Sequence, residues 1–128
     1  MSIRIESTSA MIDTEMYVSE DKILEFIKKI ETYSSHSNFG ISNFQFGEFG
    51  HEYAGGAAYF RFHTKKPDEV YLSIYVETSH TKIPDSYVSN HLKMHALTDF
   101  FEIENFIQEM KNFMANEKNE AILKIRNH

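Results

Sequence analysis

Two alternating runs on either side of a Pro-Asp turn constrain the fold of this chain more than any other feature. The runs cover residues 57–64 and 69–78, and the turn between them holds Pro67 and Asp68. Runs rich in β-branched and aromatic residues on both sides of such a turn predict a β-hairpin. In each run apolar residues alternate with polar ones, so each strand has one face for a core and one for solvent, as in antiparallel sheets.

The apolar face of this hairpin defines a predicted core. Phe60 and Phe62 share that face with Leu72 and Ile74. After Asp99, apolar residues recur at spacings of three and four, which predicts an amphipathic helix that covers the same face. The residues expected in one core are Phe60, Phe62, Leu72, Ile74, Leu92, Met94, Ile103, Ile107 and Met110.

The rest of the chain supplies further strands and a first helix. Ser19, followed by two acidic residues, is typical of a helix N-terminus, and apolar residues continue at helical spacing to about Tyr33. Strands are predicted at residues 2–8, 11–18, 39–49 and 87–97, a loop at 81–85, and a second helix capped by Asp99. Residues 121–126 fit a last strand, a continuation of the helix or a packed tail.

These elements together predict one α+β domain over residues 1–128. In it, an antiparallel sheet of about four to six strands carries two helices. The C-terminal helix is expected to pack on the apolar face of the sheet.

Composition and charge exclude several classes of protein. The net charge is −6, from 13 basic and 19 acidic residues, which opposes binding along a nucleic-acid backbone. There is no cysteine, so disulfides, thiolate metal sites and a Cys nucleophile are excluded. No run approaches the 18 apolar residues of a membrane span, and the N-terminus lacks the apolar part of a signal peptide. We therefore expect a cytoplasmic protein that does not contact membranes.

Two histidine motifs suggest a metal, but neither fits one. His91 and His95 have the HxxxH spacing, which on a helix could share a zinc ion. The surrounding alternation instead predicts a strand, on which the two side chains would lie roughly 13 Å apart, with Lys93 between them. His51 begins a match to the HExxH zinc-protease motif that Gly55 breaks. We expect no metal, no cofactor and no catalytic residue.

The polar face of the predicted sheet is the strongest candidate for a binding site. Tyr and Arg, which dominate binding hot spots, gather there, although Tyr is also a good strand former and the face could be ordinary solvated surface. A second candidate is the acidic outer side of the C-terminal helix, which would steer a basic partner. The predicted partner-binding residues are Tyr59, Arg61, His63, Tyr71, Tyr75, His91, His95, Glu104 and Glu109. Affinity is expected to reside in Tyr59, Arg61, Tyr71 and Tyr75.

Residues 59–62, 71–76 and 97–106 carry a resemblance to a known class of proteins. With the small size, the acidic charge and the order of sheet then helix, they resemble small bacterial immunity proteins of polymorphic-toxin and contact-dependent inhibition systems. The resemblance spans about residues 39–114 and implies a cytoplasmic protein that binds and blocks a cognate toxin, often a basic nuclease. It assigns no individual site residue.

Other functions remain open at this point. Residues 56–62 are also similar to the aromatic strand of RNA-recognition folds, but the leading basic residue and the second glycine of that pattern are missing, and we expect no nucleic-acid partner. The His cluster could serve a small enzyme or a ligand or metal binder. A homodimeric structural protein that pairs through a sheet face or its tail is a further alternative. The function that we expect is that of a non-enzymatic protein-binding module.

Overall fold

A computed structural model of the chain describes residues 2–6, 11–16, 18–35, 40–50, 56–66, 68–78, 81–83, 86–115 and 121–125. The central hairpin forms as its alternation predicts. β4 (Ala57–Lys66) pairs antiparallel with β5 (Glu69–Glu77), which places Phe62 opposite Leu72. Asp68 in the turn has a φ of 62°, a left-handed conformation that Asp adopts more readily than most residues.

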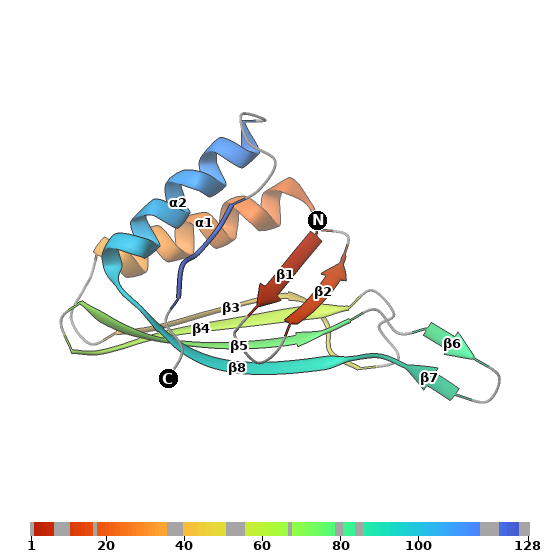
Figure 1. Ribbon diagram of the computed structural model, residues 1–128. Coiled ribbons are helices and arrows are strands. Elements are labelled where there is room, and N and C mark those ends of the chain that lie inside the picture. Colours follow the sequence, from red (N-terminus) through yellow and green to blue (C-terminus); the bar gives the residue numbers. More distant parts are fainter. Residues whose placement is uncertain are drawn as a thin grey trace.

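Two more strands complete an antiparallel sheet of four strands, within the predicted range. β3 (Ile41–Gly47) lies beside β4 and β8 (His91–Thr98) beside β5, in the order β3-β4-β5-β8 (Figure 1). β1 (Ser2–Glu6) and β2 (Met11–Glu15) form a separate hairpin at the predicted position. Gly47 ends β3 with a φ of +69°, and a side chain there would collide with the Gly56 carbonyl oxygen, so this position requires glycine.

The prediction for residues 81–97 is wrong in two respects. The expected loop contains β6 (Thr81–Ile83), which pairs with β7 (Ser86–Val88) as a second small hairpin. The expected strand 87–97 is broken between β7 and β8. At the break, Thr78 N donates to Asn90 O at 2.9 Å and Asn90 N donates to Thr78 Oγ1 at 2.8 Å. A β-branched residue in each short strand favours the ladder, and the prediction of a loop at residues 81–85 overlooked this.

Both helices begin where their caps predict. Ser19 precedes α1 (Glu20–Ser35), and its Oγ accepts from Lys22 N at 3.3 Å. Asp99 precedes α2 (Phe100–Met114), and its Oδ1 accepts from Glu102 N at 2.8 Å. Each side chain satisfies a backbone donor that the first turn leaves without a partner.

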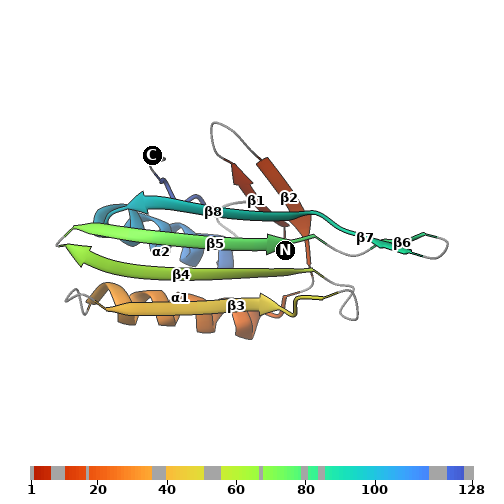
Figure 2. The same ribbon diagram turned by 90° about the horizontal axis from the view of Figure 1, so that it is seen from below.

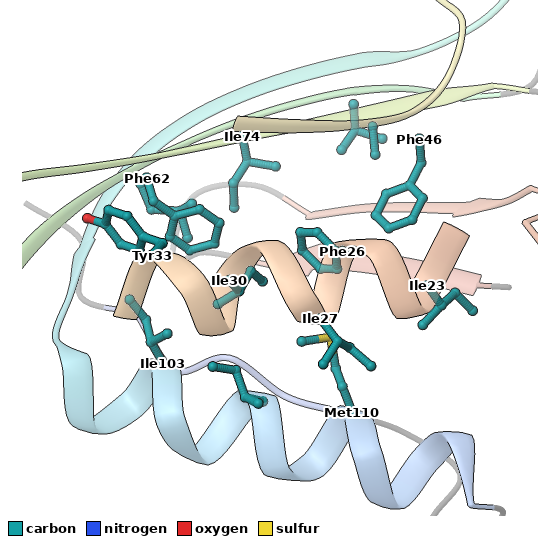
Figure 3. Packing of buried hydrophobic residues seen from close by; sticks show 14 of the residues in the cluster. Ile23, Phe26, Ile27, Ile30, Tyr33, Phe46, Phe62, Ile74, Ile103 and Met110 are labelled. Atoms are coloured by element: carbon teal, nitrogen blue, oxygen red, sulfur yellow. The ribbon is translucent and has the colours of Figure 1, made fainter. Parts of the chain in front are cut away.

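The helices lie on one side of the sheet, together with the β1–β2 hairpin (Figure 1). Figure 2 shows the opposite side of the sheet in front, with both helices behind it. α1 packs directly on the sheet, where the Phe26 ring lies 5.0 Å from Phe46 and 5.4 Å from Phe60. α2 packs on α1, with Ile103 and Met110 turned toward it (Figure 3). The predicted position of the C-terminal helix on the apolar side of the sheet is confirmed.

The predicted core is also confirmed. Seven of the nine predicted residues belong to one buried cluster, and the other two, Phe60 and Leu92, are partly buried and pack against it. The cluster further includes residues that the sequence did not assign to it, from the N-terminal hairpin and from α1: Ile12, Met16, Ile23, Phe26, Ile27, Ile30 and Tyr33.

Residues 121–125 form the packed tail, one of the three alternatives that the sequence allowed. They are neither helix nor strand, and Ala121, Leu123 and Ile125 pack against the core. Thr98 Oγ1 donates to Lys124 O at 2.9 Å. The tail therefore closes the apolar side near the C-terminal end of β8. No helix in the described ranges is both long enough and apolar enough to cross a membrane.

A buried hydrogen bond joins Tyr33 of α1 to Thr64 of β4. Burial raises the pKa of the Tyr33 phenol above its ordinary value, and the hydrogen bond with Thr64 partly offsets this. The unfolded chain thus releases this proton at a lower pH than the folded chain. The contribution of the neutral phenol to stability is complete below about pH 10 and is lost as the pH rises further.

We expect Tyr33→Phe to remove this alkaline sensitivity. At neutral pH the variant should lose about 1–2 kcal/mol, because the Thr64 hydroxyl loses its partner. Between about pH 10 and pH 11 the difference in unfolding free energy from the parent should shrink, since only the parent has a phenol to ionise at this site. Urea unfolding of both proteins across this range measures the difference, and parallel pH profiles would contradict the assignment.

Candidate functional site

The face of the sheet turned away from the helices carries most of the predicted site. Side chains alternate along each strand, so residues between the core positions all point to this side. Antiparallel pairing arranges them in rows across the four strands. We call this surface the open face, and it has three main rows. The first row is Gln45, Tyr59, Tyr75 and Lys93, and the second is Asn43, Arg61, Ser73 and His95. The third row is Ile41, His63, Tyr71 and Leu97.

Two tyrosines stack at the centre of the open face. The rings of Tyr59 and Tyr75 lie 5.5 Å apart and are inclined by 25°. Lys93 Nζ lies 5.4 Å from the centre of the Tyr75 ring, and the His95 ring meets the same tyrosine edge-on at 6.2 Å. A cation over the face of an aromatic ring and an edge-on contact between two rings are both favourable. Tyr75 is therefore held in place on three sides by neighbours from two strands.

His95 is oriented by the strand next to it. Its Nδ1 and the Ser73 hydroxyl are hydrogen-bonded at 2.9 Å. Arg61 lies opposite Ser73 in the same row. An arginine, a serine and a histidine therefore occupy adjacent positions in this row.

The row at the other end of the sheet is more apolar. Tyr71 lies opposite both His63 and Leu97. Tyr71 is 38% exposed and Ile41, at the edge of the row, is 54% exposed, whereas Leu97 is buried. The exposed tyrosine and the exposed isoleucine, on either side of His63, add apolar contact area to the polar centre.

Glu77 is the one buried carboxylate described on this side of the sheet. It is 3% exposed, and its Oε2 accepts from Gly50 N at 2.8 Å. Its Oε1 lies 3.3 Å from His91 Nε2, an ion pair when the imidazole is protonated. A buried carboxylate needs such partners to offset its lost hydration. Glu77 and His91 therefore fix the edge of the open face next to the loop that contains Gly50.

We expect Glu77→Ala to lower the free energy of unfolding by about 1–3 kcal/mol, because Gly50 N loses its acceptor and His91 its partner. Glu48→Ala is the matched control, since Glu48 is exposed and its loss should change stability by at most about 0.5 kcal/mol. Urea unfolding of both variants gives the comparison. Equal losses would show that the buried contacts of Glu77 contribute nothing.

The HxxxH histidines lie on a strand, as predicted. His91 and His95 are both exposed on β8, and each has its own cross-strand neighbour, Glu77 and Ser73. Within the ranges that the structure describes, no three His, Asp or Glu side chains are placed to hold a metal ion. His51 and Gly55, from the HExxH comparison, lie outside those ranges.

The two predicted acids lie elsewhere. Glu104 and Glu109 are on α2, which lies on the helix side of the sheet (Figure 1). Glu104 is exposed, whereas Glu109 Oε2 accepts from Ile122 N at 2.6 Å and so holds the tail. The structure thus brings together seven of the nine predicted residues and separates the other two from them.

Comparisons of the chain with protein-family models, with curated proteins and with solved structures return no match.

The sequence alone did not assign Asn43 and Gln45 to the site. Both point to the open face from β3, opposite Arg61 and Tyr59. The alternation of Phe44 and Phe46 with polar residues indicated their orientation, but only the strand order shows that β3 neighbours β4. The alternation placed Lys93 between the two histidines on the polar face, and its position over the Tyr75 ring makes it part of the aromatic centre.

Proposed function

We propose that this protein binds another protein through its open face, and that it is an immunity protein that neutralises a cognate bacterial toxin. The observation that carries the first part is the Tyr59–Tyr75 stack, flanked by Lys93 and His95. Rigid aromatic side chains bury a large area at a small cost in conformational entropy, and Tyr and Arg are enriched at hot spots. Tyr75 is already fixed by its neighbours, so little of its freedom is lost on binding.

The narrower part of the proposal is supported by charge and by the sequence resemblance. A net charge of −6 favours association with a basic protein, such as a toxin nuclease, through long-range steering. Glu104, exposed on α2, belongs to that acidic surface. On this proposal the acids raise the association rate, while the open face supplies most of the affinity.

The arrangement gives less support to catalysis by the histidines. His91 and His95 are separately engaged, one with a buried carboxylate and one with Ser73. The hollow of about 490 Å³ lined by Lys28, Glu31 and Glu104 lies between the helices, on the other side of the sheet from these imidazoles. The Ser73 hydroxyl does lie within hydrogen-bonding reach of the His95 imidazole, at 2.9 Å, as a nucleophile and its base would. Such a pair also needs a third group that orients the base, and among the described residues no further hydrogen bond to the His95 ring supplies one.

The test is capture of the partner from cells that encode the protein, with a tagged chain and identification by mass spectrometry. We expect a toxin domain among the captured proteins, and co-expression of the chain should restore growth to cells that produce that domain. A captured toxin whose activity is unaffected by a molar excess of the protein would contradict the immunity function. Stoichiometric zinc or nickel in untagged protein would instead favour a metal binder.

A further inference from the structure

The two edge strands of the sheet differ in whether side chains form hydrogen bonds with their outward backbone groups. β3 and β8 are the edge strands. Thr64 N of β4 donates to Gly40 O, so alternate residues from Ile41 onward turn their polar backbone groups outward. Two of those outward carbonyls are occupied, Asn43 O by Lys29 Nζ at 2.8 Å and Gly47 O by Gln45 Nε2 at 2.8 Å. Side chains placed in this way protect an edge from strand addition.

The edge at β8 has no comparable protection in the described part of the chain. Asn90 O accepts from Thr78 of β5, so Leu92 and Met94 also pair inward, and His91, Lys93 and His95 direct their N–H and C=O groups outward. Among the described residues, no hydrogen bond reaches these outward groups. Lys93 does not guard the edge, because its Nζ lies over the Tyr75 ring.

Along this edge Lys93 carries a positive charge, and His91 and His95 carry one when they are protonated. The residues whose backbone groups point outward have their side chains on the open face, and all three side chains are basic: His91, Lys93 and His95. The nearest carboxylate, Glu77, is buried against Gly50 and His91. A second copy of the chain, paired through β8, would bring an identical row of basic side chains to this edge and would offer Lys93 no carboxylate. An extended segment with carboxylates at alternate positions would complement the row instead.

We propose that the outer edge of β8, from His91 to His95, receives an extended acidic segment of the partner protein as a fifth strand. The backbone of that segment pairs with the outward groups of β8, and its alternate carboxylates lie beside Lys93 and the two imidazoles. The tail reaches β8 at Thr98, which limits the free stretch to the five residues before Ala96. This inference rests on the proposed protein-binding function and specifies the segment of the partner that docks. That segment is negatively charged, even if the partner as a whole is basic.

Hydrogen exchange of the free protein, read by NMR, is the first test. The amides of Lys93 and His95 should exchange at least about tenfold faster than those of Met94 and Ala96, which pair with β5. Addition of a short peptide that alternates glutamate and valine should slow exchange at Lys93 and His95. A peptide that alternates lysine and valine should have no such effect. Protection of Lys93 and His95 in the free protein, or equal effects of the two peptides, would overturn the proposal.

A pair of variants tests the same edge with the captured partner. His95→Pro and His95→Ala both lose the imidazole, but only the proline variant loses the outward N–H, and proline is tolerated at such edge positions. We expect His95→Pro to bind at least about tenfold more weakly than His95→Ala, with equal melting curves. If both bind the partner equally, the edge proposal is wrong while protein binding stands. If the glutamate peptide protects the edge but the captured toxin stays active, the edge proposal stands and the immunity function is wrong.

Discussion

Replacing Leu72 with Ala should lower the free energy of unfolding by about 2–5 kcal/mol. Leu72 is 1% exposed in the middle strand pair of the sheet, opposite Phe62 and Ala96. Truncation removes three buried carbons and leaves a cavity that close-packed neighbours on β4 and β8 cannot fill. The loss should appear as a lower midpoint in urea with an unchanged slope, because the fold and the surface exposed on unfolding stay the same.

Leu24→Ala is the matched control for this experiment. It is the same chemical truncation on α1, but Leu24 is 50% exposed, so the unfolding free energy should change by at most about 0.5 kcal/mol. A Leu72→Ala protein within about 0.5 kcal/mol of the parent would contradict the assignment of this residue to the core.

The strands of the sheet could be predicted from the sequence wherever apolar and polar residues alternate within a single strand. The alternation around Phe62 and Leu72 specifies both faces, because a shift of one residue would turn the apolar set to solvent. Helix starts were predictable for a similar reason, since Ser19 and Asp99 act on backbone groups within the next three residues. Such signals are local and do not depend on the rest of the fold.

The parts that were missed depend on contacts between distant residues. Glu77 alternates like its exposed neighbours, and it is buried because Gly50, far away in sequence, supplies a donor. The sequence around Glu109 is that of an exposed acidic residue, but its carboxylate accepts a hydrogen bond from the backbone N–H of Ile122. Ile122 belongs to the tail, and no periodicity in the sequence indicates where the tail runs. The seven predicted site residues on the open face were found because the strands alternate. The two on α2 were assigned by charge alone to a second candidate surface.

Replacing Tyr75 with Ala should weaken binding of the partner by at least about 2 kcal/mol, or roughly thirtyfold. The ring is half-buried at the centre of the open face, between Tyr59, Lys93 and His95. Its removal takes away the contact area and also releases the three side chains that it holds. Most of the loss should appear as faster dissociation, because short-range contacts determine how long a complex lasts.

The stability of the free protein should change less than its affinity in this variant. Tyr75 belongs to the open face and not to the core cluster, so no close-packed cavity forms in the protein when the ring is removed. A melting curve near that of the parent would separate a binding defect from unfolding. Tyr75→Phe, which keeps the stacked ring, should retain most of the affinity.

Surface plasmon resonance with the captured partner tests most directly whether affinity resides in the open face. The variants are Tyr71→Ala and Tyr75→Ala on that face and Glu104→Ala on α2. The account predicts that each tyrosine variant loses at least about 2 kcal/mol, whereas Glu104→Ala changes mainly the association rate and its dependence on salt. Tyrosine variants that bind like the parent, together with a loss of more than about 2 kcal/mol in Glu104→Ala, would place the binding site on the helices and contradict the account.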